Sequence, residues 1–478
     1  ALDGFSTTQI WPYAASVTGS WYDYSGSHPT IAVVDSGIDA SRLDFAGRLL
    51  ANVNLSTLPG NSAGDGRGHG TFVAGIAAGA SAGYAGADPR AKLVSLDVID
   101  DQGMARTSDV IGAADWILRN KDAYGIRVAN FSLHASRANS FMFDPLDKAV
   151  EKLWFNGVVV VAAAGNYATA GQESGVPFAP GNDPFVITVG AADMHGTIRA
   201  SDDTVAPWSA YGHTLDGFAK PELVAPGRFI IGPVPMSATL VADKPGNVVG
   251  PGYMQLSGTS FAAPIVAGAA AYILSKHPSW TPDQVKGALM VTARPISSTV
   301  PALAAGVGEA NVSAAGQRDR VPNPNAALKS FLVADPSGAP GPVFDAASWA
   351  NAAQASASWA DASWADASWA DASWATASWA DASWADASWA DASWATASWA
   401  DASWADASWA TASWADASWA DASWADNADD DTVGSADAVL VDPSAAAAAD
   451  ASAGIDPSLD PVAAVAVATD ATVTVSAP

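Results

Sequence analysis

The sequence predicts an α/β fold in which a doubly wound, mostly parallel sheet carries helices on both faces, followed by a low-complexity C-terminal extension. Three observations lead to this prediction. Short apolar runs recur through the first part of the chain, helical stretches of amphipathic or small residues lie between them, and beyond residue 318 the composition becomes biased. In sheets of this kind, active groups gather at the carboxyl ends of the strands.

The apolar runs are continuous rather than alternating, which is typical of parallel strands covered on both faces. The expected strands are 30–35, 92–99, 127–133, 157–165 and 184–191, and the expected helices are 69–80, 108–122, 143–156, 260–276 and 282–293. The last helix has the clearest start signal, because Thr281 can act as the cap, Pro282 suits the first turn and Gln284 completes a capping box.

The chain is expected to divide into four parts. Residues 1–318 have the composition of a globular domain, and 319–346 are rich in Pro, Ala and Gly, which predicts a linker. Residues 347–426 form an ASWAD pentapeptide repeat tract, and 427–478 form an acidic Ala, Val and Pro-rich tail that is expected to be disordered.

Charge and cysteine content exclude several classes of function. The net charge is −27, but the 22 basic residues all lie before Asp345, and 21 of the 49 acidic residues lie from Asp345 onward. The excess of negative charge therefore belongs mainly to the region from Asp345 onward, and the lack of a basic patch argues against nucleic-acid binding. The absence of cysteine excludes a disulfide framework, a thiolate metal site and a cysteine nucleophile.

Three short motifs carry chemistry. Asp35 ends the apolar strand in AVVDSGID, where a buried carboxylate needs a partner, although a structural turn is the alternative. His69 stands between two glycines in GDGRGHGTFVAG, at the expected start of a helix. Ser260 in GTSFAAP precedes an apolar helix, whose N-terminus favours negative charge. A serine nucleophile needs a base within reach and the base needs an orienting partner, and these three residues meet both needs.

Taken in order along the chain, VVDSGID, GHGT-VAG, AAGN and GTSFAAP resemble the subtilisin-like serine proteases, the subtilases. The resemblance covers roughly residues 25–315 and implies a subtilisin-like fold in the domain 1–318. It also implies that Ser260 attacks the peptide carbonyl, that His69 takes and returns the proton, and that Asp35 orients His69. Asn166 would donate its side-chain amide to the oxyanion, with a turn asparagine as the alternative.

The resemblance further implies a peptide-binding strand along NFSLHAS and AAAGN. The candidate substrate-binding residues are Ser132, Leu133, His134, Ala163 and Gly165. At His134 the family usually has glycine, so this side chain either narrows the pocket for the residue before the cut or turns outward.

Two further departures concern a histidine and a metal. Phe72 stands where the family usually has a second histidine, which is not part of the triad. Asp44 matches a frequent calcium ligand, but the stretch that should supply its partners is short and poor in Asn. We expect no cofactor for catalysis and no catalytic metal, while a structural calcium ion is left open.

Fifteen of the 21 tryptophans belong to the repeat tract, counting Trp349. A period of five fits neither a helix nor a strand, so the tract is either a disordered stalk, a solenoid, or a multivalent surface whose Trp residues contact cell-wall sugars or partner chains.

The main hypothesis is an extracellular, secreted serine endopeptidase that acts on protein or peptide substrates as a monomer. Because the chain starts at Ala1 and shows no leader, we expect that an N-terminal segment is missing from this sequence. The alternative is a cell-surface attachment protein that uses its protease domain mainly for self-processing.

Overall fold

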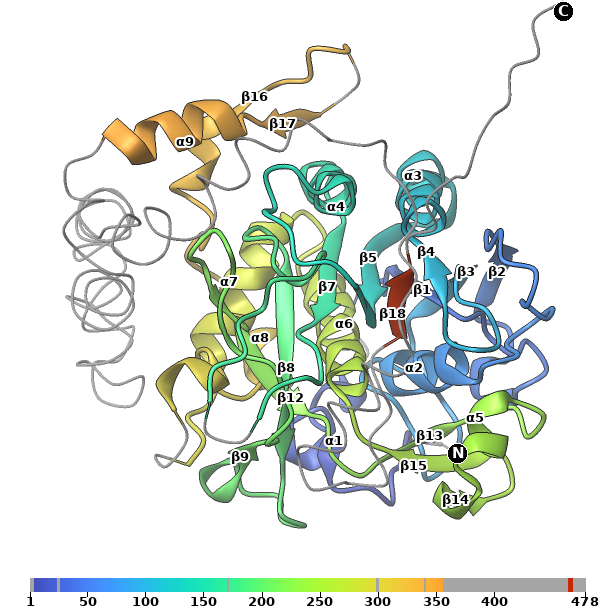
Figure 1. Cartoon of the computed structure of the whole chain (residues 1–478). Helices are drawn as coiled ribbons and strands as arrows, with labels where there is room; N and C mark the ends of the chain where they lie inside the picture. Colours follow the sequence, from blue (N-terminus) through green and yellow to red (C-terminus); the bar gives the residue numbers. More distant parts are fainter. Residues whose placement is uncertain are drawn as a thin grey trace, which may run out of the picture.

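The computed structural model describes residues 4–23, 26–169, 172–297, 301–338, 341–355 and 463–466. At its centre lies a parallel sheet, shown in Figure 1. Its strands run in the order β12 (Leu223–Pro226), β8 (Ile187–Asp193), β7 (Val159–Ala163), β5 (Ile126–Phe131), β1 (Thr30–Asp35), β3 (Lys92–Asp97) and β2 (Leu49–Asn54). The short strand β9 (Thr204–Val205) pairs antiparallel with β8. This arrangement confirms the predicted fold class.

Every residue of the central strands β1, β7 and β8 is buried. This burial explains why these strands are continuous apolar runs, since both faces of the sheet are covered. Among the parallel strands of this sheet, two escaped the sequence prediction. The strand β2 alternates between half-buried and exposed residues at the edge of the sheet, and β12 has only four residues, so neither has a long apolar run.

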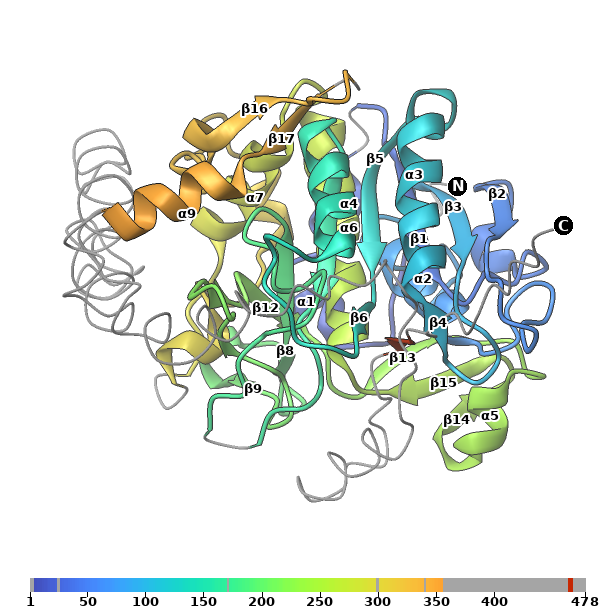
Figure 2. The same cartoon turned by 45° about the horizontal axis from the view of Figure 1, so that its top comes forward.

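Helices cover both faces of the sheet (Figures 1 and 2). One face carries α3 (Thr107–Tyr124) and α4 (Pro145–Phe155), which also pack against each other. The other face carries α2 (His69–Ala78) and α6 (Thr259–Lys276). The helix α6 crosses β5, β7, β8 and β12, and all but the last of its residues are buried. An apolar, small-residue helix of this kind belongs in the core rather than at the surface.

The helix α7 (Pro282–Thr292) confirms its predicted start, because Thr281 and Gln284 form a capping box. The other helices are α1 (Trp11–Ala14), α5 (Thr239–Asp243), α8 (Val312–Ala315) and α9 (Ala346–Ala355). Short 3₁₀ turns occupy Ser20–Tyr22, Leu43–Phe45, Ala200–Asp202, Pro245–Asn247, Ala302–Ala305 and Leu328–Phe331.

Smaller sheets lie around the central one. An antiparallel sheet joins β13 (Ile230–Pro233), β15 (Tyr253–Leu256) and β14 (Val248–Gly250), and β10 (Gly212–His213) pairs with β11 (Ala219–Lys220). A third sheet has the order β4 (Ala105–Arg106), β18 (Ala463–Ala466) and β6 (Leu133–Ala135). The composition predicts disorder for the whole tail, whereas these four tail residues form a strand. The rest of the tail and the repeat tract from residue 356 lie outside the described residues.

The structure also differs from the prediction of a linker over 319–346. There, β16 (Leu332–Ala334) and β17 (Pro342–Phe344) form an antiparallel pair that leads into α9. Trp349 is only 2% exposed and its ring lies 5.9 Å from that of Phe218 and 5.7 Å from that of Phe141. The first tryptophan of the repeat pattern is therefore an anchor in the core, and Phe344 is buried beside it. The other domain boundaries stay predictions.

Candidate active site

The structure brings Asp35 and His69 into direct contact. Asp35 ends β1 and His69 begins α2, and the Nδ1 atom of His69 lies 2.7 Å from Oδ1 of Asp35. Both side chains are buried, at 0% and 2% exposure. A buried carboxylate that accepts a hydrogen bond from Nδ1 fixes the ring orientation and leaves Nε2 to act on a substrate or nucleophile.

A second buried carboxylate, Asp65, shapes the loop that presents His69. Its oxygens accept the backbone N–H groups of Gly68 at 2.6 Å and Thr71 at 2.7 Å and the hydroxyl of Ser36 at 2.8 Å. Burial raises the pKa of Asp65 to about 6, and the same cause raises the pKa of neighbouring Asp97 to about 7. The sequence interpretation missed Asp65, although its place before the glycines of GDGRGHG was a local signal.

Glycine is required on both sides of His69. Gly68 has a φ of 89°, which side chains rarely adopt. At Gly70, a Cβ atom would lie 2.1 Å from the carbonyl oxygen of Gly37. The backbone of α2 therefore begins directly against the loop that follows Asp35, which brings the two functional side chains together.

Ser260 lies in the first turn of α6, as predicted, and is fully buried. Its Oγ lies 3.4 Å from the carbonyl oxygen of Ser132, and the Ser132 hydroxyl donates to the carbonyl of Ser260 at 2.8 Å. The next residue, Phe261, places its ring 5.4 Å from the ring of His69. Ser260 thus starts a helix that packs against the histidine, and its hydroxyl lies at the end of β5.

Asn166 is held by the residue before Ser260. Its Oδ1 accepts the backbone N–H of Thr259 at 2.9 Å and the Thr259 hydroxyl at 3.0 Å. The same hydroxyl accepts the N–H of Gly165 at 3.1 Å. Because Thr259 occupies the side-chain oxygen of Asn166, the NH₂ group of the same amide points away from Thr259. Thr259 was not among the predicted site residues, and its two hydrogen bonds show that it orients Asn166.

Residues 26–323 match the subtilase family. Serine protease AprX of Bacillus subtilis is 38% identical over 286 residues, covering 57% of this chain and 63% of that protein. Subtilisin of Bacillus pumilus is 37% identical over 296 residues, covering 62% of this chain and 93% of that protein. Among solved structures, a cold-adapted subtilisin-like serine proteinase is 30% identical, with 58% of this chain and 87% of that chain covered and a TM-score of 0.45.

The chain belongs to the subtilase family. The matched region covers the four motifs that carried the resemblance, and it ends before the repeat tract. The chain spans just under two thirds of AprX.

The predicted substrate-binding residues of this subtilase lie at or after the ends of two neighbouring strands of the central sheet, β5 and β7. Ser132 precedes β6, which contains Leu133 and His134, and Ala163 ends β7 just before Gly165. Ser132 contacts Ser260 through its hydroxyl, and the N–H of Gly165 contacts the neighbouring Thr259. Their role in binding stays a prediction.

The His134 ring does not turn outward. It stacks on Phe178 at 5.2 Å between ring centroids and meets the edge of Tyr167 at 5.7 Å. Its Nδ1 lies 2.8 Å from the carbonyl of Ala135, and burial lowers the pKa of His134. A Cβ atom added at Gly165 would lie 2.1 Å from the Tyr167 ring, so the aromatic group fills the space above Gly165. Phe178 and Tyr167 were not predicted from the sequence, since their contribution depends on contacts between distant loops.

Phe72 occupies the position at which the family usually has a second histidine, and its ring packs in the core. Phe72 is fully buried, its ring lies 4.4 Å from that of Phe261, and a Cβ atom at Gly232 would lie 2.7 Å from it. The aromatic pair supports the start of α6 next to His69.

The contacts of Asp44 do not fit a calcium ion. The Arg42 guanidinium lies 2.8 Å from Oδ2, and the Tyr253 hydroxyl donates to Oδ1 at 2.8 Å. Arg42 thus supplies the positive charge that a cation would bring. Within the described part of the chain, no group of three or more His, Asp or Glu side chains is arranged to hold a metal ion.

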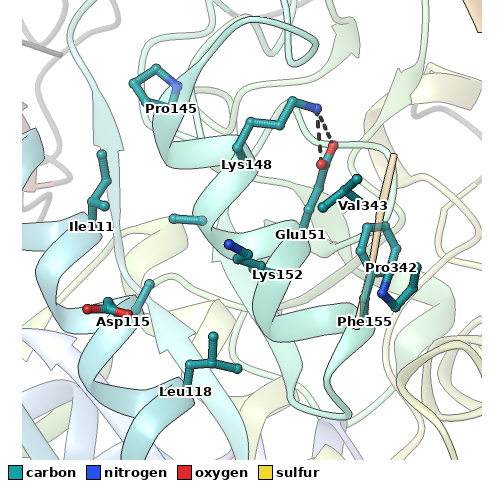
Figure 3. Close-up of a pocket in the computed structure, with 12 residues that line it drawn as sticks. Ile111, Asp115, Leu118, Pro145, Lys148, Glu151, Lys152, Phe155, Pro342 and Val343 are labelled. Carbon is teal, nitrogen blue, oxygen red and sulfur yellow. Dashed lines mark hydrogen bonds and ion pairs between the residues drawn. The ribbon is translucent and has the colours of Figure 1, made fainter. Parts of the chain in front are cut away.

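A groove between α3 and α4 lies apart from the catalytic residues (Figure 3). Its walls combine apolar side chains with charged ones, among them Lys148 and Glu151, which form an ion pair at 2.8 Å. None of the candidate catalytic side chains lines it.

No helix among the described residues is long and apolar enough to cross a membrane.

Proposed function

We propose that this subtilase is a secreted serine endopeptidase that hydrolyses peptide bonds through Asp35, His69 and Ser260. The observation that carries the proposal is the buried contact between Asp35 and His69 at 2.7 Å, with the His69 ring packed against the residue that follows Ser260. Catalysis of this kind needs a base, an orienting carboxylate and a hydroxyl nucleophile, and it needs no cofactor.

In the proposed reaction, His69 accepts the Ser260 proton through Nε2 while Oγ attacks the peptide carbonyl. Asp35 stabilises the imidazolium that forms, because its carboxylate group lies beside Nδ1. The amide of Asn166 donates to the oxyanion, and Thr259 keeps that amide in orientation. The proton then passes to the leaving amine, and water hydrolyses the acyl-enzyme by the same steps in reverse order.

The decisive experiment compares the parent chain with Ser260→Ala in casein hydrolysis and in covalent labelling by a phosphonyl fluoride. We expect the variant to lose both activities while its circular dichroism is unchanged. Ser275→Ala is the matched control, since its hydroxyl lies at the far end of α6 and bonds the carbonyl of Tyr272. Hydrolysis by Ser260→Ala at the parental rate would refute the assignment.

We further propose that the enzyme prefers a small residue before the cut. The contacting rings of His134, Phe178 and Tyr167 support this preference, because the Tyr167 ring fills the space beside Gly165. His134→Gly should raise kcat/KM for a peptide with Phe before the cut, relative to Ala, by roughly tenfold or more. An unchanged ratio for the two peptides would contradict the proposal.

Protein or peptide substrates, a monomeric state and a secreted location complete the proposal. Surface attachment through the repeat tract also stays a proposal, because the tract lies outside the described residues. No described contact favours a purely self-processing role.

A further inference from the structure

A segment of the tail lies beside the predicted peptide-binding residues. The strand β18 lies between β4 and β6 and completes a three-stranded sheet, drawn in dark red in Figures 1 and 2. Ala463 pairs with Leu133 and Val465 pairs with both Ala135 and Ala105. More than 300 residues of chain separate β6 from β18, so this is a long-range contact made by backbone groups.

The register places one end of β18 next to the nucleophile. Ser132, which directly precedes β6, exchanges two contacts with Ser260 at 2.8 and 3.4 Å. Ala463 pairs with the first residue of β6, and Val465 pairs with the last. The tail strand therefore starts at the Ser260 end and runs away from it.

This direction is opposite to that of a substrate, an argument that rests on the proposed function. The residue before the cut is expected near His134, with the preceding residues farther along β6, so a substrate must run toward Ser260 and antiparallel to β6. The strand β18 runs parallel to both β6 and β4. If a peptide bond at the start of β18 lay at Ser260, the residues on its acyl side would therefore lie outside the site between β4 and β6.

We propose that residues 463–466 form a tethered inhibitory strand that competes with substrates for the site between β4 and β6 and is not cleaved there. Main-chain pairing gives such a strand affinity without demanding particular side chains. The proposal assigns residues 463–466 a function that is separate from catalysis.

The size of the effect follows from the tether. An effective concentration of about five times the Kd of the strand would lower kcat/KM roughly sixfold. Competition raises KM and leaves kcat unchanged.

The first test measures hydrogen exchange in full-length Ser260→Ala, which needs no enzymatic activity. Adding Val465→Pro removes one N–H from the centre of the tail strand and should speed amide exchange in 104–107 and 131–136. Val439→Pro alters the same type of residue elsewhere in the tail and is the control. Equal exchange in these peptides with and without Val465→Pro would overturn the proposal.

The second test measures hydrolysis of a short chromogenic peptide by the active full chain. Val465→Pro should raise kcat/KM about three- to tenfold through KM, whereas Val439→Pro should not. A rise in both variants, or cleavage within 463–466 by the parent chain, would refute a specific, uncut strand. If the exchange difference appears but no variant is labelled at Ser260, the tail site stands and the proposed protease function fails.

Discussion

Thr259→Val isolates the group that holds the oxyanion donor. The change keeps the shape of a buried side chain and removes a hydroxyl that makes two hydrogen bonds, at 3.0 Å to Asn166 and 3.1 Å to Gly165. The backbone N–H of residue 259 still contacts Asn166 Oδ1, at 2.9 Å. The amide of Asn166 thus keeps one of these two contacts and gains freedom to rotate.

The expected decrease in kcat lies between no decrease and the decrease that follows removal of the oxyanion donor. Removing an oxyanion donor costs roughly 3–4 kcal/mol of transition-state stabilisation, whereas one neutral hydrogen bond contributes about 1 kcal/mol. We therefore expect Thr259→Val to lower kcat about fivefold to tenfold with little change in KM, and Asn166→Ala to lower kcat by a hundredfold or more.

The assay is steady-state hydrolysis of a peptide anilide by the parent, both single variants and the double variant. Because Thr259 is proposed to act through Asn166, the double variant should be no slower than Asn166→Ala alone. The reasoning is refuted if Thr259→Val leaves kcat unchanged, or if it slows the Asn166→Ala enzyme by the same factor as the parent.

Three further results are expected. Activity should fall at acid pH, because His69 must be neutral to act as a base, and a flat profile of kcat/KM down to pH 4 would count against it. Burial raises the pKa of Asp216 to about 7 from 3.8, so the native chain holds more protons than the unfolded chain between these values and stability falls as pH rises through this window. Asp216→Asn should flatten that fall in urea unfolding at pH 4–8 in the Ser260→Ala background, and an unchanged slope would disprove it. Trp349→Ala should cost roughly 3 kcal/mol or detach α9, as seen in thermal unfolding, whereas an equal loss from Trp359→Ala would argue against a specific anchor.

The sequence reveals candidate residues that stand in local motifs more readily than residues whose role depends on contacts between distant segments. Asp35, His69, Asn166 and Ser260 each stand in a short motif whose glycines, strand end or helix start are local, so the candidates were visible before any contact was known. Phe178 was missed because its ring partners, His134 and Tyr167, come from other segments, whereas Asp65 had a local signal that was overlooked. The linker prediction over 319–346 failed because composition averages over a segment, while two aromatic residues, Phe344 and Trp349, are enough to dock it.

The sequence by itself determined the alternation of five buried strands and five helices, the residue types of the triad candidates and the exclusion of cysteine chemistry, because periodicity and motif spacing are properties of the chain. Tertiary structure alone decided that Thr259 holds Asn166, that the His134 ring turns inward, and that four tail residues pair with β4 and β6. The physical reason is that hydrogen bonding and burial depend on which distant segments meet. That choice is made by packing of the whole chain, and no local pattern records it.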